Sequence, residues 1–405
     1  MPPPAPSPQP QSRPLAIVGA SVRAAAASAI RAGFRPLAAD LFADGDLRAI
    51  ATTTRITPYP EGLLDWLRAV EPAAWMYTGA LENHPELVDQ MAWVAPLWGN
   101  PGDVLARVRS PFELARALHD AGLLFPETRD SAEGLPRDGS WLAKTYRGAS
   151  GSGVREFDRE SVDLDGIRAV CFQKRIAGIP CAAAYAARNG SAVLMGVTRQ
   201  LIGESWFGSR GFQYAGSIGP LPISESTEQV IERIGKVLTE RFELAGVFGV
   251  DMVIDGDSVW TIEVNPRYTA SIEIVERANG IQALAEHAAA FSEGLGTEDL
   301  GLRSSNTPTA QSPAPSPQPR VHGKAILFAR RDIALSRPFV EDALQQATQK
   351  PWPLLADISP ANAPIETGRP ILTLFAEGND AEQVEQRLRQ RTVDLERQIY
   401  GSKEL

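Results

Sequence analysis

A chain of 405 residues is too long for one small core and suits two or three packed domains. Its formal net charge of −9 disfavours nucleic acid as the main partner, and its two cysteines, Cys171 and Cys181, exclude a disulfide framework and lack the spacing of a zinc site. No apolar run approaches the roughly 20 residues that span a membrane, and the N-terminus lacks the pattern of a secretion signal, so we expect a cytoplasmic protein.

Proline-rich segments divide the chain. Residues 1–13 and 304–320 are rich in Pro, Ala, Ser and Gln, and both contain the phrase Pro-Ala-Pro-Ser-Pro-Gln-Pro. Such segments bury too little apolar surface to offset chain entropy, so we expect a disordered tail and a linker. The division predicts an N-terminal domain over 14–105, a central domain over 106–303 and a small C-terminal domain over 321–405.

The N-terminal domain opens with alternating strand and helix patterns. A short apolar run ends at Gly19, an Ala-rich helix follows over about 22–32, and a second strand ends at Asp40. A further strand is expected over 74–79, with ligand-binding loops at the carboxyl ends of these strands. This pattern predicts a Rossmann-like α/β domain. Gly19 lacks the other glycines of a GxGxxG motif, which counts against a dinucleotide-binding dehydrogenase.

The central and C-terminal domains have an α+β pattern. A helix is expected to begin at Pro111, with Ser110 as its N-cap. Further expected elements of the central domain are strands over 141–145, 170–175, 182–187, 192–197, 246–254 and 259–264 and a helix over about 227–242. Strands over 323–329 and 371–376 and an amphipathic helix over about 381–400 make the small C-terminal domain.

A lysine followed by glycines is the first candidate site. Lys144 ends an expected strand and leads into a loop that contains Gly148, Ser150, Gly151 and Gly153. Glycines let backbone N–H groups converge on an anion, and lysine supplies a mobile positive charge. Phosphate binding is one interpretation of this loop, and a flexible hairpin with an incidental lysine is the other.

The strongest motif is an expected hairpin that carries two acids. Asp251 lies on one apolar strand, and Glu263 and Asn265 lie on one face of the returning strand, at a similar depth from the turn. Carboxylate and amide oxygens suit Mg²⁺ that substrate phosphates also hold. Arg267 follows and can contact a phosphate or carboxylate. Exposed acids on a hairpin are the alternative, but these acids interrupt apolar strands, where unpaired carboxylates are costly.

In order and spacing, these motifs resemble the ATP-grasp superfamily. A third motif, Gln-Lys-Arg-Ile-Ala-Gly from Gln173 to Gly178, lies between the other two and resembles the adenine-binding hinge, although a plain crossover between strands explains it equally well. The resemblance covers roughly Leu15 to Gly294. It implies a Rossmann-like domain followed by ATP-grasp subdomains that grip ATP, and a small C-terminal α+β domain.

The resemblance also implies roles for individual residues. ATP and Mg²⁺, for which Mn²⁺ can substitute, are the implied cofactors. Lys144 and the loop residues Gly148, Ser150, Gly151 and Gly153 would contact phosphates; Gln173, Lys174 and Ile176 would meet adenine; Asp251, Glu263 and Asn265 would hold the metal; and Arg267 would stabilise the transferred phosphate. Four places depart from the usual pattern: Gln173, Pro180 and Gly249 each replace a charged residue, and Arg-Ser-Pro at 109–111 replaces a common Asp-Lys helix start.

Within the superfamily, three segments look nearest to the branch that contains tyramine–L-glutamate ligase. They are Tyr77–Asn83, Leu97–Asn100 and Asn265–Ser271. Segments near Asp357 and over 366–371 are similar to the C-terminal domain of carboxylate–amine and carboxylating members. This resemblance implies a carboxylate–amine ligase that forms an acyl-phosphate and then an amide, in the biosynthesis of a coenzyme for one-carbon metabolism.

The substrate side of the site is expected around an aromatic, glycine-hinged loop over 206–216, either a lid or a core-packing turn. Its Arg210 is a further catalytic candidate. The candidate contacts to a small-molecule carboxylate, such as glutamate or another amino acid, and to an amine are Tyr214, Ser271, Glu82 and Asn83. Polar loop residues such as Glu82 and Asn83 can equally be solvated. An ATP-dependent carboxylase that uses bicarbonate and a nucleotide-binding regulator without catalysis are the alternative functions. The sequence leaves open whether the chain forms a homodimer.

Overall fold

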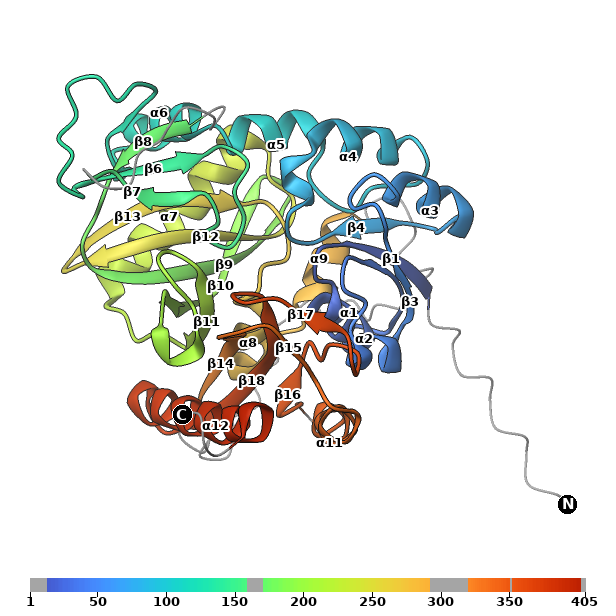
Figure 1. Cartoon of the computed structure of the whole chain (residues 1–405). Coiled ribbons are helices and arrows are strands. Elements are labelled where there is room, and N and C mark those ends of the chain that lie inside the picture. Colours follow the sequence, from blue (N-terminus) through green and yellow to red (C-terminus); the bar gives the residue numbers. More distant parts are fainter. Residues whose placement is uncertain (1–12, 159–169, 292–319, 350–351, 402–405) are drawn as a thin grey trace, which may run out of the picture.

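The computed structural model describes residues 13–158, 170–291, 320–349 and 352–401 (Figure 1). Except for Arg13 and Arg320, the expected tail over 1–13 and linker over 304–320 lie outside the described residues. The described parts form an N-terminal lobe, a central lobe and a C-terminal segment that packs below both in the view of Figure 1. No helix formed by the described residues is both long and apolar enough to cross a bilayer.

The N-terminal lobe is built on a parallel sheet with the strand order β3-β2-β1-β4. The apolar run before Gly19 forms the buried strand β1, and helices cover both faces of the sheet. The elements are β1 (Arg13–Gly19), α1 (Arg23–Arg31), β2 (Phe34–Asp40), α2 (Gly45–Ile50), β3 (Thr52–Arg55), α3 (Leu63–Val70), β4 (Trp75–Tyr77), the 3₁₀ turn η1 (Leu81–Asn83), α4 (Pro85–Ala92) and α5 (Gly102–Val108). The predicted α/β class of this lobe is confirmed.

A large antiparallel sheet forms the centre of the molecule, in the order β13-β12-β9-β10-β11-β14-β18-β16. Its strands are β9 (Ile179–Arg188), β10 (Ser191–Ile202), β11 (Tyr214–Gly219), β12 (Gly246–Asp255), β13 (Ser258–Asn265), β14 (Val321–Phe328), β16 (Leu355–Ala356) and β18 (Pro370–Gly378). The strands expected for a separate C-terminal domain therefore continue the same sheet, because β14 pairs with β11. They are followed by α12 (Ala381–Tyr400).

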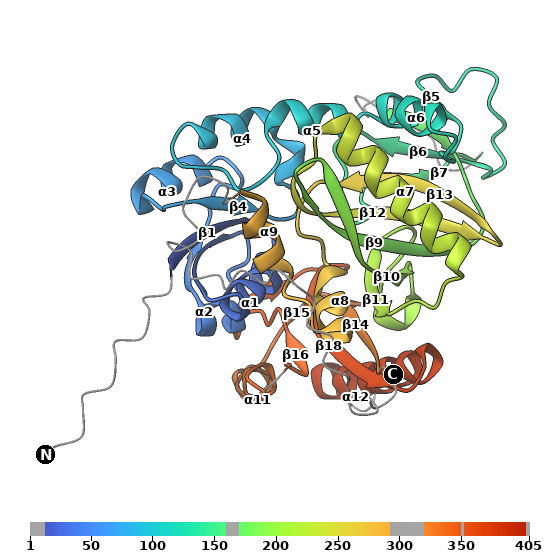
Figure 2. The same cartoon turned by 180° about the vertical axis from the view of Figure 1, so that it is seen from behind.

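A second, smaller sheet has the order β5-β8-β6-β7 and lies beside the large one. Its strands are β5 (Thr128–Arg129), β6 (Trp141–Thr145), β7 (Val154–Glu156) and β8 (Val170–Lys174). The preceding helix α6 (Pro111–Asp120) begins as expected, since the Ser110 hydroxyl accepts a hydrogen bond from the backbone N–H of Glu113. The long helix α7 (Glu225–Phe242) crosses one face of the large sheet (Figure 2).

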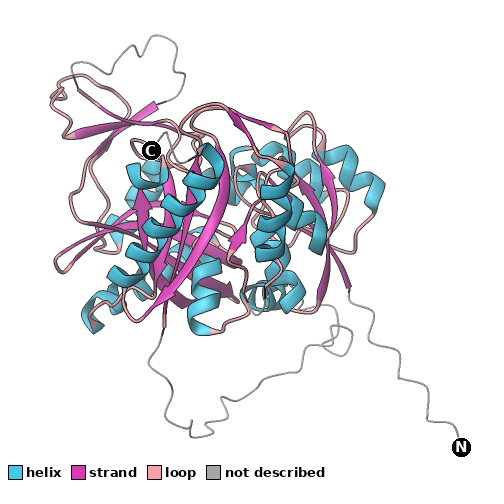
Figure 3. Ribbon diagram, turned by 60° about the horizontal axis from the view of Figure 1, so that its bottom comes forward, coloured by secondary structure: helices cyan, strands magenta, loops and turns pink. Residues whose placement is uncertain are grey.

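Two helices join the lobes. They are α8 (Ile272–Asn279) and α9 (Ala283–Phe291), which pack between α1 and the large sheet. The remaining elements belong to the C-terminal segment: β15 (Ile333–Ala334), α11 (Arg337–Ala347) and β17 (Pro364–Ile365), and its helix α12 packs on β14 and β18. Figure 3, coloured by secondary structure, shows helices packed along the strands of the molecule. The sequence patterns did not predict α8, α9 or strand β11, part of which falls within the expected lid.

A buried ionic cluster fixes the C-terminal segment against the other two parts. Glu273 at the start of α8 accepts hydrogen bonds from Arg23 of α1 and, at 3.2 Å, from Lys324 of β14. Burial acts to raise the pKa of Glu273, but these two cations outweigh it and hold that pKa well below its usual range. The contacts of Glu273 with Arg23 and Lys324 therefore hold α8, the large sheet and the N-terminal lobe in one relative arrangement.

Candidate active site

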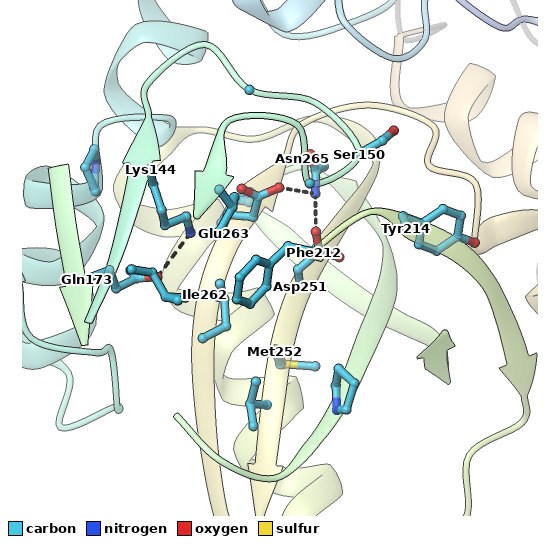
Figure 4. A pocket seen from close by; sticks show the side chains of 18 of the residues that line it. Lys144, Ser150, Gln173, Phe212, Tyr214, Asp251, Met252, Ile262, Glu263 and Asn265 are labelled. Atoms are coloured by element: carbon cyan, nitrogen blue, oxygen red, sulfur yellow. Dashed lines mark hydrogen bonds between the residues drawn. The ribbon is translucent and has the colours of Figure 1, made fainter. Parts of the chain in front are cut away.

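A cavity of about 400 Å³ lies between the small sheet and the end strands of the large sheet. Figure 4 shows Lys144 of β6, Asp251 of β12 and Glu263 of β13 facing into it from opposite sides. Lys144, Asp251 and Glu263 come from segments that are far apart in the sequence, and the antiparallel pairing of β12 with β13 aligns the last two. The residues of the strongest sequence motifs therefore converge on one place.

The two acids of the hairpin are direct cross-strand partners, with Asp251 opposite Glu263. The Asn265 amide nitrogen donates to both of them, at 3.0 Å to Asp251 Oδ2 and 3.4 Å to Glu263 Oε1. Gln200 of β10, which the sequence patterns did not single out, donates to Asp251 Oδ1 at 2.8 Å. The carboxylates are thus held side by side by neutral amide donors.

Burial and the neighbouring carboxylate raise the pKa of Asp251 to about 7. Burial acts the same way on Glu263, but the nearby cations Arg109 and Lys144 outweigh it and lower the pKa of Glu263. Two adjacent buried carboxylates favour either a shared proton or a bound cation. A positive charge bound beside the carboxylates of Asp251 and Glu263 would therefore be stabilised.

Lys144 is held in place by a neutral partner. Its ammonium group donates to Gln173 Oε1 at 3.1 Å, and the amide of Gln173 donates in turn to Thr128 Oγ1 at 3.4 Å. Gln173 is buried and lines the cavity beside the lysine. Because no carboxylate among the described residues forms an ion pair with Lys144, its charge remains available for an anion. The glutamine at this place thus orients the lysine without neutralising it.

The glycine-rich loop covers the cavity, and two of its glycines are required by the backbone. Gly151 has a φ of +78°, and a Cβ atom there would lie 1.8 Å from the carbonyl oxygen of Phe212. Gly153 has a φ of +83°, and its Cβ would lie 2.1 Å from Thr145 Oγ1. Ser150 and Gly148 line the cavity beside them. The loop therefore packs tightly against both its own strand and the segment of Phe212.

Arg267 is paired with a residue of the N-terminal lobe. Its Nε atom lies 2.8 Å and its Nη2 atom 2.7 Å from Glu82 Oε1. Glu82 is buried, and its other oxygen, Oε2, has no hydrogen-bond partner among the described residues. Glu82 is a candidate contact to the amine; in the structure its carboxylate holds Arg267, and its contact to an amine stays a prediction.

Asn83 also has a partner within the protein. Its amide nitrogen donates to the carbonyl oxygen of Gly148 at 3.3 Å, at the base of the glycine-rich loop. Arg109, which the sequence showed only as a departure from the usual helix start, donates to both Asn83 Oδ1 and the Gly148 carbonyl. Arg109 lines the cavity, and its position just before the N-cap of α6 was the available sequence signal.

The expected lid is only partly a loop. Ser205–Phe207 forms a 3₁₀ turn with Phe207 in the core, and Tyr214 begins strand β11. Between them, Phe212 faces the cavity (Figure 4). Arg210 is exposed and is not among the residues that line the cavity, so the structure does not bring this catalytic candidate to the site.

Two further substrate candidates do line the cavity. Tyr214 donates or accepts a hydrogen bond with Ser217 at 2.8 Å, and Ser271 does the same with Thr269 at 3.0 Å. Tyr214 lies at the edge of the cavity, with its hydroxyl directed away from Asp251 (Figure 4).

The opposite end of the cavity is apolar. Met252, Ile262 and Phe212 present apolar side chains, as Figure 4 shows. The segment from Lys174 to Ile176 forms part of the wall there, and Pro180 stands on it without a polar side chain. A flat heterocycle bound between apolar side chains and an exposed strand end suits this region.

The residues fit a nucleotide with a divalent cation. The buried carboxylates Asp251 and Glu263 are hard oxygen ligands of the kind that Mg²⁺ or Mn²⁺ prefers. Asn265 directs its amide nitrogen at them and its oxygen toward Arg267 at 3.4 Å, so it joins a metal only after a half-turn of the amide. Lys144 and the backbone of the glycine-rich loop suit phosphates at the same end.

Comparisons with known proteins agree with this geometry. Residues 109–271 match the model of the ATP-grasp domain. Formate-dependent phosphoribosylglycinamide formyltransferase of Thermococcus kodakarensis is 39% identical over 80 residues, which are 20% of this chain and 17% of that protein. An uncharacterised protein of Methanocaldococcus jannaschii is 27% identical over 169 residues, 41% of this chain and 34% of that protein. The chain thus matches well under half the length of these curated relatives.

Solved structures cover nearly the whole chain. The crystal structure of an N5-carboxyaminoimidazole ribonucleotide synthetase with ADP has a TM-score of 0.66 and 16% identity, over 95% of this chain and 97% of that one. The L-amino acid ligase from Bacillus licheniformis has a TM-score of 0.67 and 15% identity, over 95% and 98%. The chain therefore has the ATP-grasp fold, with the match to an ATP-grasp domain over residues 109–271 and the predicted parallel-sheet lobe at its N-terminus.

Proposed function

We propose that this chain, with its ATP-grasp domain, is an ATP-dependent ligase that joins a small-molecule carboxylate to an amine. The observation that carries the proposal is the convergence of Lys144, the glycine-rich loop, Arg267 and the carboxylates of Asp251 and Glu263 on one cavity. These groups neutralise and position phosphates. They are the groups that phosphoryl transfer needs, because that reaction depends on positioning and charge stabilisation more than on a protein nucleophile.

The proposed reaction has two steps. A substrate carboxylate oxygen attacks the γ-phosphorus of ATP, the bond to the β,γ-bridging oxygen breaks, and ADP leaves. The amine then attacks the carbonyl carbon of the acyl-phosphate, phosphate leaves with the bonding electrons, and the nitrogen loses a proton. A bound Mg²⁺ supplies charge neutralisation of the phosphates.

The protein's own residues have distinct tasks in this scheme. Lys144, oriented by Gln173, binds phosphate at the strand end. Arg267, oriented by Glu82, directs its guanidinium toward the developing negative charge next to Asn265. Phe212 and the glycine-rich loop cover the cavity and exclude water, which protects an acyl-phosphate from hydrolysis.

The substrates are proposed from the sequence motifs. The segment Asn265–Ser271, similar to the branch with tyramine–L-glutamate ligase, supports glutamate or another amino acid as the carboxylate and a role in building a one-carbon coenzyme. The L-amino acid ligase among the solved neighbours supports the same substrate class. The N5-carboxyaminoimidazole ribonucleotide synthetases among those neighbours favour a second candidate, in which bicarbonate is the activated carboxylate.

The test is ADP release with amino acids, alone and paired with amines, and in parallel with ¹⁴C-bicarbonate. We expect amide product and ADP in equal amounts with one amino acid–amine pair. Asp251→Asn and Glu263→Gln should each lower this rate by on the order of 100-fold or more. Asp257→Asn, an exposed change in the turn of the same hairpin, should keep the wild-type rate.

Three results would count against the proposal. Full activity of Asp251→Asn would remove the carboxylates from the mechanism. Incorporation of labelled bicarbonate, without an amide product, would establish the carboxylase instead. Tight nucleotide binding without ADP release for any substrate pair would favour a regulator.

A further inference from the structure

One short turn of the N-terminal lobe contacts two separate parts of the nucleotide site. This turn, η1, carries Glu82 and Asn83 as successive residues. Glu82 holds the guanidinium of Arg267, and Asn83 holds the carbonyl of Gly148. The lobe outside the ATP-grasp domain thus positions both the arginine and the phosphate-side loop.

Three hydrogen bonds close a triangle at the base of the glycine-rich loop. The Gly148 carbonyl accepts from the Asn83 amide nitrogen and from Arg109 Nη2, each at 3.3 Å. Arg109 Nη2 also donates to Asn83 Oδ1 at 3.1 Å. A carbonyl oxygen has two lone pairs and a guanidinium NH₂ group has two hydrogens, so the Gly148 carbonyl and Arg109 Nη2 each make two of these contacts, and the Asn83 amide donates one and accepts one.

The triangle holds the base of the glycine-rich loop, and a separate backbone hydrogen bond holds its tip. At the tip, the carbonyl of Ser150 accepts from the backbone N–H of Tyr214 at 3.2 Å. At the base, the side chains of Asn83 and Arg109 make the contact between the loop and the rest of the site. Arg147, directly before Gly148, is exposed. Without the triangle, the loop entrance would be free to move away from the cavity.

Arg109 combines this contact with a charge at the phosphate side. It lines the cavity, lowers the pKa of the neighbouring Glu263, and forms no ion pair with an acid among the described residues. Its other guanidinium nitrogens are therefore available to an anion. Since one side chain both faces the phosphates and holds the loop, an anion in the cavity and the loop position are physically linked.

We propose that Asn83 and Arg109 are positioning residues that hold the glycine-rich loop over the nucleotide phosphates. In this role Asn83 acts through the loop and through Arg109. The inference rests on the proposed function insofar as the loop binds phosphates. It adds that the N-terminal lobe sets the affinity for nucleotide through its η1 turn.

The experiment uses Asn83→Ala with two measurements that do not need catalysis. One is the Kd for Mg-ADP by calorimetry, and the other is the rate of tryptic cleavage after Arg147, with and without Mg-ADP. We expect the Kd to rise about 10-fold and the cleavage rate to rise by a similar factor, as loss of about one hydrogen bond to a held loop implies. Mg-ADP should slow the cleavage of both proteins.

Asn279→Ala is the matched control. Asn279 also donates its amide to a backbone carbonyl, that of Met195 at 2.9 Å, but it does not line the cavity. It should keep Kd and cleavage rate within about twofold of wild type. Asn83→Asp is the second variant: it keeps an acceptor for Arg109 but cannot donate to Gly148, and its carboxylate repels the Gly148 carbonyl oxygen and adds negative charge near the phosphates, so its Kd should also rise about 10-fold or more.

The inference is overturned if either folded Asn83 variant matches Asn279→Ala in Mg-ADP affinity or in cleavage rate. It is supported only if both Asn83 variants loosen the loop and weaken Mg-ADP binding while Asn279→Ala does neither. These outcomes are separate from those of the ligase assay, because a chain that releases no ADP with any substrate can still show the loop effect.

Discussion

A buried histidine allows a stability prediction with a definite pH window. His287 on α9 is 2% exposed and bridges two lobes: its Nδ1 accepts from the backbone N–H of Val247 at 2.9 Å, and its Nε2 lies 3.1 Å from the carbonyl of Trp98. This pair of contacts requires the neutral imidazole with its proton on Nε2. Burial lowers the pKa of His287 from 6.5 to about 4.

The direction of this pH dependence follows from proton binding in the folded and unfolded states. Between pH 6.5 and 4 the unfolded chain binds a proton at this histidine and the folded protein does not, so the free energy of unfolding falls as the pH is lowered through that window. At 1.36 kcal/mol per pKa unit, the full loss is about 3 kcal/mol near pH 4. His287→Gln should be less stable than wild type at pH 7, because the Val247 and Trp98 contacts are disturbed, but should lack this part of the pH dependence.

The assay is urea unfolding of both proteins at pH 7.0, 5.5 and 4.5, with the difference between them taken at each pH. Taking the difference cancels the carboxylates that titrate in both proteins. We expect the stability gap between wild type and His287→Gln to shrink steadily toward pH 4.5. A gap that stays constant, or an imidazole NMR titration with a midpoint above pH 6, would refute the reasoning.

Two further predictions concern the active site. Glu82→Gln leaves the buried guanidinium of Arg267 without its counter-charge. We therefore expect a loss of about 3 kcal/mol in the free energy of unfolding, measured in urea, and a fall in ligase rate. Unchanged stability would show that the ion pair is not needed to hold the charge of Arg267. Gly151→Ala places a methyl group against the Phe212 carbonyl oxygen at a residue with positive φ. Mg-ADP affinity, measured by calorimetry, should therefore fall about 10-fold or more, while thermal stability changes little. Wild-type affinity would show that the loop adopts another conformation when nucleotide binds.

The sequence predicted those strands and helices whose hydrophobic pattern along the chain matches their burial in the folded protein. The alternating apolar runs near Gly19 and Asp40 and the hairpin of Asp251 and Glu263 form as expected, because hydrophobic periodicity and turn residues determine them. Strand β11 was missed because four of the six residues of Tyr214–Gly219 are small and the segment directly follows the expected lid loop, and only pairing with β10 and β14 makes it a strand.

The sequence predicted the residues proposed to bind the nucleotide and the metal, but not the protein side chains that hold those residues in place. Lys144, Asp251 and Asn265 lie in motifs of recognisable order, but nothing local indicates that Gln200 would reach Asp251 or that Glu82 would face Arg267. Such contacts join segments that only the folded chain brings together. Arg210 illustrates the converse, since a suitable residue type in a suitable loop still points into solvent.

The continuity of the large sheet has a consequence for how the chain is made. β11 pairs with β10 on one side and with β14 on the other, and β14 follows it only after the rest of the central lobe has been synthesised. Until β14 leaves the ribosome, the outer edge of β11 presents unpaired N–H and C=O groups, which are templates for pairing with another chain. A truncated chain that ends before Val321 would keep that edge unpaired, so the segment from Val321 onward both covers the edge of β11 and completes the large sheet.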